Sequence, residues 1–340
     1  MRAVTARRSF LRQTALGAAG WIGAALSARR GGAAPPTRDA ARRVFAAGPP
    51  AAVLVHVLAP HALLGWPGPL DQEARAWLGA PAADLPVLGR LAGRGSTASL
   101  EALVALKPDL IVDVGSVDDT RASTAERVRA QTGVRCELLG GRLAESPALL
   151  RRAGDLLGVA ARAERLAREA ERILEEVERG RPRRASIRVY LARGSDGLET
   201  GRAGSLNAEV LELVGARNVA AVTGPGGLLR VSPEQVLAWD PEVVLTQDRA
   251  FARAAASDPF WRTAATARPR RVLLAPTTPF GWIDAPPGVN RLIGLLWLAR
   301  RLDPRPAQDD LRTRVRAFYD SFYGIALDEA RLDELLGVGS

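Results

Sequence analysis

One pattern of apolar and polar positions occurs twice in this chain, at residues 99–114 and again at residues 232–247. In each copy a serine precedes a short stretch with helical spacing, a proline interrupts it, and an apolar run rich in β-branched residues follows. Because serine is a favoured helix N-cap and the residue before proline disfavours helix, each copy predicts a short helix followed by a buried strand. Each copy also places a glutamate, Glu101 or Glu234, in the first helical turn. One unit used twice predicts two lobes of similar build.

Apolar runs bounded by turn residues predict further strands and helices around the two copies. Besides the strand of the second copy, the expected strands span residues 44–48, 63–66, 109–115, 135–140, 187–192 and 271–275. The expected helices span residues 51–58, 71–78, 100–106, 121–132, 144–157, 206–214, 289–302, 310–323 and 328–336. Strands that alternate with helices of this length predict an α/β fold with mostly parallel sheets.

Residues 159–179 differ from the rest because they contain no glycine or proline and are rich in alanine, glutamate, arginine and leucine. They predict one amphipathic helix about 30 Å long, at a rise of 1.5 Å per residue. Its apolar stripe consists of Leu166, Ala170, Ile173, Leu174 and Val177. A single rigid helix between two lobes would limit how far they can hinge. The expected organisation is an N-terminal lobe at 42–157, a linking helix at 158–182 and a C-terminal lobe with terminal helices at 183–340.

The N-terminus has the features of an export signal. Paired Arg7 and Arg8 are followed by Phe10 and then by a weakly apolar run at residues 14–26. This arrangement resembles a twin-arginine signal, and the run is shorter than the about 20 residues that a membrane-spanning helix needs. We therefore expect residues 1–34 to be a cleaved signal. No cysteine follows the run, so we expect no lipid anchor and a soluble protein in the periplasm.

Charge and composition exclude several classes of function. The formal net charge is +10, but residues 1–34 hold six arginines and no acidic residue, which leaves 41 basic and 37 acidic residues elsewhere. A modest, scattered positive charge does not indicate nucleic-acid binding. The chain has no phosphate-binding loop, zinc-type Cys/His spacing or serine nucleophile motif, and its two histidines, His56 and His61, have the wrong spacing for one helical face. Cys136, the only cysteine, is expected to be a buried thiol. We expect neither catalysis, nor a cofactor, nor a metal site.

Arginine and aromatic residues gather where the predicted strands end, which is where open α/β sheets place ligands. Arginine offers a planar fork of donors for anionic groups, and aromatic rings offer flat apolar area. The ordinary alternative for each arginine is a solvated surface group, and for each aromatic residue it is core packing. The candidate ligand-binding residues are Trp66, Arg90, Arg94, Arg142, Tyr190, Arg193, Phe280 and Trp282.

Several segments together resemble a known family, the periplasmic solute-binding proteins that deliver iron–siderophores, haem, cobalamin and related metal complexes to ABC importers. They are the two copies of the repeat, the helix at 205–219, and the segments 258–261 and 279–298. The resemblance implies two Rossmann-like lobes joined by a single long rigid helix, and a monomeric binding protein rather than an enzyme. It also implies that Glu101 and Glu234 dock into arginine pockets of a permease in the inner membrane, since family members use one surface glutamate per lobe in this way.

The ligand is less narrowly defined than the family. The arginines favour an anionic chelate and the aromatic residues favour something larger than a bare ion, so a ferric siderophore ranks first and cobalamin or another corrinoid second. An oxyanion such as molybdate or tungstate, and haem, are alternatives. Haem is disfavoured because histidine is nearly absent and Tyr190 is the only tyrosine before the C-terminal helices. A ligand sensor or a chelatase-like enzyme on the same scaffold is the alternative from another class.

Overall fold

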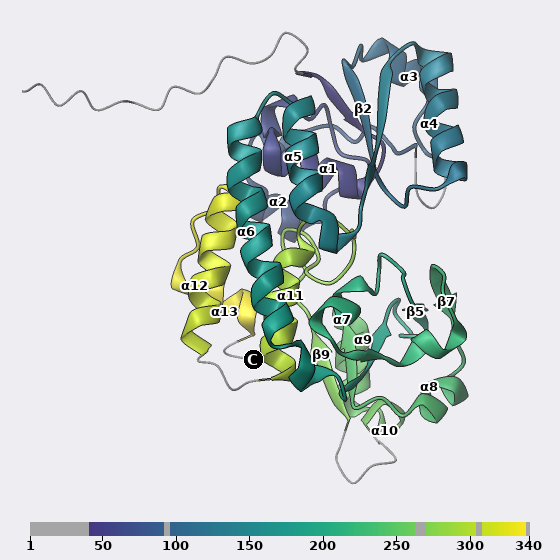
Figure 1. Ribbon diagram of the computed structural model, residues 1–340, viewed down its shortest axis with the longest axis vertical. Coiled ribbons are helices and arrows are strands. Elements are labelled where there is room, and N and C mark those ends of the chain that lie inside the picture. Colours follow the sequence, from purple (N-terminus) through teal and green to yellow (C-terminus); the bar gives the residue numbers. More distant parts are fainter. Residues whose placement is uncertain (1–40, 92–95, 263–269, 304–307, 338–340) are drawn as a thin grey trace, which may run out of the picture. The chain divides into compact units, whose positions relative to one another are not determined.

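The computed structural model describes residues 41–91, 96–262, 270–303 and 308–337. Its architecture is α/β, with two parallel sheets, one before and one after a long helix (Figure 1). This confirms the fold class expected from the alternation of strands and helices. The expected export signal at residues 1–34 lies outside the described residues. Within the described residues, no helix combines the length and the apolar character needed to cross a membrane.

The N-terminal lobe is built on three parallel strands in the order β1–β2–β3. They are β1 (Val44–Ala46), β2 (Leu110–Gly115) and β3 (Arg135–Gly140). The helices of this lobe are α1 (Pro49–Leu58), α2 (Gln72–Leu78), α3 (Leu100–Ala105), α4 (Asp119–Thr132) and α5 (Ser146–Leu156), with 3₁₀ turns at Pro60–Ala62, Ala82–Asp84 and Leu143–Glu145.

The sequence of β2, apolar except for Asp113, fits its central place in the sheet. All six of its residues are buried. Ile111 packs with Leu103 of α3 and Val128 of α4, whereas Leu110 and Val112 belong to the core on the other face, which includes α1. A strand covered on both faces does not alternate apolar and polar residues. Because the three strands are parallel, the loops that follow β1 and β2 leave the sheet at the same edge.

The C-terminal lobe contains a second parallel sheet, of order β6–β4–β8–β9, and a small antiparallel ribbon, β5–β7. The strands are β4 (Arg188–Ala192), β5 (Glu199–Gly201), β6 (Arg217–Asn218), β7 (Leu228–Arg230), β8 (Val243–Thr246) and β9 (Arg271–Leu274). The helices are α7 (Glu209–Val214), α8 (Pro233–Trp239), α9 (Arg249–Ser257), α10 (Pro259–Arg262) and α11 (Arg291–Leu302), with 3₁₀ turns at Arg181–Arg184 and Val219–Thr223.

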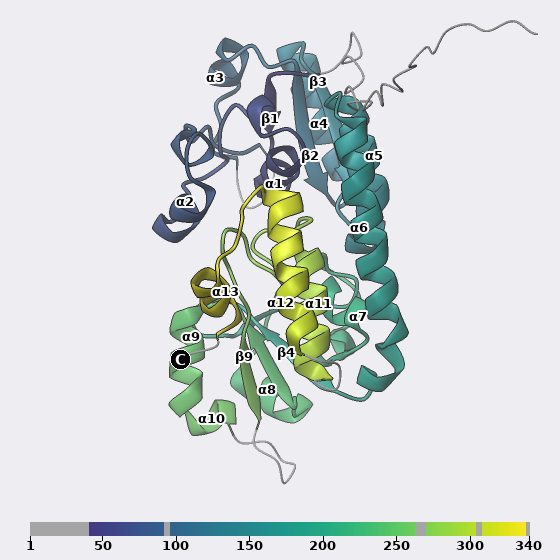
Figure 2. The ribbon, with the colours of Figure 1, turned by 90° about the vertical axis from the view of Figure 1, so that its left-hand side faces the viewer.

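The expected long helix is present as α6 (Ala160–Arg179) and links the two sheets along the chain. It packs against α5 at one end and against α11 of the C-terminal lobe. The chain then ends with α12 (Gln308–Phe318), which continues into a π-helical turn (Tyr319–Tyr323), and α13 (Glu329–Leu336). Figure 2 shows α12 running beside α11. The guanidinium of Arg162 on α6 donates to Val57 O of α1 and to Phe322 O, so α6 ties an early helix of the fold to its C-terminal part.

The two copies of the sequence repeat fold alike. Ser99 and Ser232 cap α3 and α8, and each hydroxyl accepts a hydrogen bond from the backbone amide three residues on, at 3.3 Å. Each helix is followed by a non-glycine residue in the left-handed region just before the proline, Lys107 with φ 47° and Asp240 with φ 44°. Each copy then supplies an interior strand of its sheet, β2 or β8. The helix–strand unit predicted from the repeat is confirmed in both places.

Some element predictions need correction. Residues 63–66 form no strand but only isolated bridges, because Trp66 exchanges backbone hydrogen bonds with Pro86 and Leu88 instead of extending the sheet. α7 begins at Glu209 rather than residue 206, since a turn at Ser205 precedes it and the Ser205 hydroxyl accepts from the Asn207 amide. Cys136 is half-buried rather than buried, and burial raises the pKa of its thiol to about 11.

Candidate functional site

A cavity of about 590 Å³ lies at the strand ends of both lobes. Five segments of the described chain supply most of its wall: the loop after β1, the end of β2 with the following loop, and three C-terminal-lobe loops. The lining residues are Gly48, Pro49, Pro50, Arg90, Asp113, Val114, Gly115, Ser116, Arg121, Arg193, Ala203, Gly204, Ser205, Leu206, Asn207, Pro225, Gly226, Gly227, Leu228, Asp284, Ala285, Pro286 and Pro287. This is the edge where parallel α/β sheets place ligands.

On the N-terminal side, one arginine–carboxylate pair dominates. Arg121 lies in the first turn of α4, and its Nη2 is 2.6 Å from both carboxylate oxygens of Asp113 on β2. The Asp113 side chain is more buried than that of Arg121, so the carboxylate holds the guanidinium from the protein side. Gly115 passes directly beneath the guanidinium, where a Cβ would stand 2.5 Å from Nη1 of Arg121. Glycine at this position therefore makes room for the arginine.

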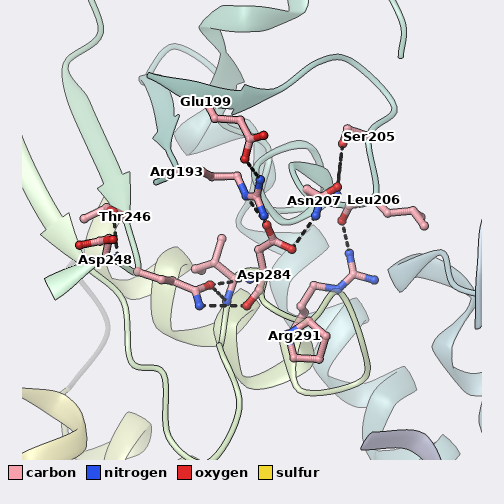
Figure 3. Close-up of polar contacts among 12 residues, drawn as sticks. Arg193, Glu199, Ser205, Leu206, Asn207, Thr246, Asp248, Asp284 and Arg291 are labelled. Atoms are coloured by element: carbon pink, nitrogen blue, oxygen red, sulfur yellow. Dashed lines mark hydrogen bonds and ion pairs between the residues drawn. The ribbon is translucent and has the colours of Figure 1, made fainter. Parts of the chain in front are cut away.

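On the C-terminal side, the arginine belongs to a larger network (Figure 3). Arg193, which follows β4, donates through Nε to Asp284 at 2.6 Å and through Nη1 to Glu199. Asp284 is buried and also accepts from Nδ2 of Asn207 at 2.7 Å. Gln247, at the end of β8, fixes the backbone of Asp284 by accepting from its amide and donating to its carbonyl at 2.9 Å.

A further arginine–carboxylate pair lies beside the cavity-lining residue Leu206 and joins the lobes. The side chain of Arg291 is 1% exposed and lies 3.3 Å from Glu209 on α7. Its Nη2 donates to Gly141 O after β3 at 2.9 Å, and its Nε donates to Gly288 O at 3.1 Å. Glu209 in turn accepts from the amide of Leu143 at 2.7 Å. Burial lowers the pKa of Arg291 from its ordinary value, while the Glu209 carboxylate opposes that shift. The pair therefore connects loops of both lobes next to the cavity.

The chemistry of the lining favours binding anionic groups. Arginine presents several N–H donors in one plane, and a guanidinium held by a carboxylate on one side keeps donors for a ligand on the other. Within the described residues, no group of three or more His, Cys, Asp or Glu side chains is placed to hold a metal ion. The arrangement is that of a binding cavity in which carboxylates hold arginine side chains in an otherwise largely apolar wall.

The structure brings two of the four candidate arginines to this cavity. Arg90 and Arg193 line it, one from each lobe. Arg142 does not line it, and its half-exposed side chain lies 3.6 Å from Glu209. Arg94 lies outside the described residues.

The four candidate aromatic residues do not line the cavity. The rings of Trp66 and Phe280 are buried 5.8 Å apart in the core, and the Trp66 indole donates to Ala82 O. Trp282 is fully buried and donates to the Tyr319 hydroxyl at 3.1 Å. Tyr190 is also fully buried, and its hydroxyl donates to Gly197 O, while burial raises the pKa of the phenol. Core packing, the ordinary alternative for aromatic residues, describes all four in this structure.

Sequence reasoning did not single out Asp113, Arg121, Asn207 or Asp284. A signal was present for Asp113, because a lone carboxylate near the end of an otherwise apolar buried strand needs a partner. Asp284 likewise interrupts an apolar segment, Phe280–Ile283, that the fold buries. The partners themselves, Arg121 and Arg193, come from other elements and are set by the tertiary fold.

The two candidate docking residues lie away from the cavity lining. Glu101 and Glu234 are exposed in the first turns of α3 and α8. The hydroxyl of Ser232, with a backbone hydrogen bond, lowers the pKa of Glu234, so this carboxylate is ionised at neutral pH.

Comparison with known families decides what kind of protein carries this cavity. A family model with the description "Periplasmic binding protein" matches residues 75–278, more than half of the chain. The chain belongs to the periplasmic binding protein family. This confirms the resemblance drawn from the repeat and the C-terminal motifs.

Individual relatives of this periplasmic binding protein differ in ligand. The molybdate-binding protein MolA of Haemophilus influenzae is 35% identical over 140 residues, which cover 40% of this chain and only 39% of MolA. Among solved structures, an ABC transporter solute binding protein from Sulfurospirillum deleyianum is 27% identical, with a TM-score of 0.78 over 88% of this chain and 95% of that one. The vitamin B12 binding protein BtuF of Vibrio cholerae shares the fold, with 19% identity and a TM-score of 0.60 over 78% and 97% of the two chains.

Proposed function

We propose that this protein captures an anionic small molecule in its cavity and delivers it to the permease of an ABC importer. The observation that carries the proposal is that three arginines, Arg90, Arg121 and Arg193, line one cavity from both lobes. Guanidinium groups bind carboxylates, phosphates and oxyanions through paired N–H donors. Asp113 and Asp284 hold two of the arginines in place before a ligand arrives, which reduces the entropy lost on binding.

A small oxyanion of the molybdate and tungstate type is the ligand that the lining supports best. No aromatic or histidine side chain occurs among the described lining residues. The aromatic residues were the ground for expecting a ligand larger than a bare ion, and that ground does not apply to this cavity. Haem is disfavoured because the described lining contains no tyrosine or histidine that could ligate its iron. The relative with 35% identity over 140 residues is named as a molybdate-binding protein, which agrees with this choice.

A ferric siderophore with negative charge is the second candidate, and the size of the cavity favours it. The volume of about 590 Å³ lies in the range of about 300–1,000 Å³ in which proteins hold drug-sized ligands. The three arginines would complement an anionic chelate as well as an oxyanion.

Titration calorimetry with a ligand panel tests the proposal. The panel contains molybdate, tungstate, sulfate, an anionic ferric siderophore, cobalamin and haem. We expect saturable binding of at least one anion, and loss of that binding in the double variant Arg121→Gln/Arg193→Gln. Arg129→Gln is the matched control, because Arg129 is an exposed arginine on the same helix as Arg121 and lies outside the cavity lining. Binding of none of the anions, or equal binding by the double variant, would contradict the proposal.

We also propose that Glu101 and Glu234 form ion pairs with arginines of the permease and that residues 1–34 direct export to the periplasm. Both carboxylates are exposed at equivalent positions of the repeat, which supports a shared role. Reversing both charges, Glu101→Lys/Glu234→Lys, should abolish ligand uptake by cells and leave calorimetric binding unchanged. Normal uptake by this variant would exclude the docking role. If the wild-type protein binds the ligand but cells that contain it take up none, a ligand sensor is favoured instead.

A further inference from the structure

The repeat presents a second matched pair of residues besides the glutamates. Val104 on α3 and Leu237 on α8 occupy equivalent positions, each three residues after the glutamate of its helix. Residues three apart on a helix lie on the same face, one turn from each other. Both side chains are exposed to nearly the same extent, 46% for Val104 and 48% for Leu237. The residue just before each, Leu103 or Val236, is buried and anchors the helix.

A single exposed apolar residue needs no explanation, but this pair has a pattern. Large exposed apolar side chains are few in the described part of the chain: Val87, Val104, Val117, Val222, Leu237 and Leu274. Two of them fall on the same repeat position. Three more are in segments next to the cavity wall, since Val117 follows Ser116, Val222 precedes Pro225, and Val87 precedes Arg90.

The two helices also share one side of the molecule in the view of Figure 1. There α3 and α8 lie on the right-hand side, whereas α6 and α12 lie on the left. By their exposure, each helix presents the same two groups to solvent, one carboxylate and one apolar side chain. Protein interfaces combine a few buried apolar anchors with charged groups that steer and orient the partner.

We infer that Val104 and Leu237 are apolar docking anchors, which enter two similar sockets of the permease, each lined by an apolar recess beside a cationic group. The inference rests on the proposed function, because the partner is the permease of that proposal. Charge complementarity defines the proposed socket: an exposed carboxylate one turn from each anchor is matched by a basic group beside the recess. The glutamates then orient the complex and the two anchors hold it, as buried apolar residues do in other interfaces.

Binding to the purified permease–ATPase complex in nanodiscs, measured by biolayer interferometry, tests the inference. Val104→Gln and Leu237→Gln keep helix propensity and remove the apolar surface. We expect each to weaken binding about tenfold, with calorimetric ligand binding and the unfolding temperature unchanged. Leu274→Gln is the matched control, because Leu274 is 42% exposed but lies on β9, outside the repeat helices, and its variant should bind like the wild type.

The outcomes separate this inference from the proposed function. Wild-type protein that binds the permease, with both variants binding equally well, would overturn the anchors alone. An effect of only one variant would overturn their equivalence. Wild-type protein that does not bind the permease at all would overturn both. If the wild type is a dimer in light scattering and the two variants are monomers, a second copy of this chain covers the anchors, and the permease assignment is wrong.

Discussion

The two lobes hold their cavity arginines in different ways. Arg121 of the N-terminal lobe has one carboxylate partner, Asp113, and rests on the bare backbone of Gly115. Arg193 of the C-terminal lobe has two, Asp284 and Glu199, and Asp284 is itself fixed by further side chains. Arg193 is held by two carboxylates, whereas Arg121 is held by one and keeps more of its N–H donors for a ligand. We infer that Arg121 contacts the ligand most directly and that Arg193 belongs mainly to the framework of its lobe.

Removing the carboxylates should produce the largest difference between the lobes. Asp284→Ala removes the buried carboxylate that accepts from both Arg193 and Asn207 and leaves Arg193 with Glu199 alone, so we expect it to lower the free energy of unfolding by about 3 kcal/mol. Asp113→Ala should cost only about 1 kcal/mol, because the Asp113 side chain is less buried than that of Asp284 and water can replace it beside the partly exposed Arg121. Urea unfolding at constant pH and salt measures both. Equal losses would show that the two lobes hold their arginines equally firmly.

Low pH should lower the free energy of unfolding through a group other than the cavity arginines, the buried His56 of α1. His56 on α1 is buried beside the rings of Trp66 and Phe280, and burial, with the nearby charge of Arg162, lowers its pKa from 6.5 to about 4. The unfolded chain takes up a proton below about pH 6.5, whereas the native protein keeps this histidine neutral down to about pH 4. Stability is therefore lost as the pH falls through this window.

We expect the free energy of unfolding to fall by about 2 kcal/mol through His56 between about pH 7.5 and pH 5. A phenylalanine ring does not titrate, so His56→Phe should remove this part of the pH dependence, as urea unfolding at several pH values would show. The wild type, unfolded under the same conditions, is the reference for the slope. An unaltered slope in His56→Phe would contradict the assignment.

The sequence was most informative where local chemistry decides the structure. The repeat predicted two capped helices and two buried strands because serine caps, proline stops and β-branched runs act within a few residues. The strand expected at residues 63–66 failed for the opposite reason. The partner that Trp66 pairs with, at residues 86–88, is chosen by the tertiary fold and leaves no signal within residues 63–66.

The sequence predicted which residue type lines the cavity better than it predicted the individual residues. Arginines at strand ends were expected, and Arg90 and Arg193 do line the cavity. The aromatic candidates were not distinguishable from core residues, because a buried tryptophan and a ligand-stacking tryptophan have the same sequence environment. The pairs Asp113–Arg121 and Asp284–Arg193 join residues from different elements, 91 positions apart in the second case, and such pairing leaves no local pattern.

Single arginine variants compare how much Arg121 and Arg193 each contribute to the affinity for the anion. Because Arg121 keeps more donors for the ligand, Arg121→Gln should weaken binding of the anion identified by the panel about tenfold, or about 1.4 kcal/mol. Arg193→Gln should weaken binding of the same anion less, since much of the Arg193 guanidinium is already engaged by Asp284 and Glu199. Both variants are measured at one temperature at which both are folded. Calorimetry on both variants, with Arg129→Gln beside them, gives the ratio directly. A larger loss in Arg193→Gln would reverse the roles assigned to the two lobes.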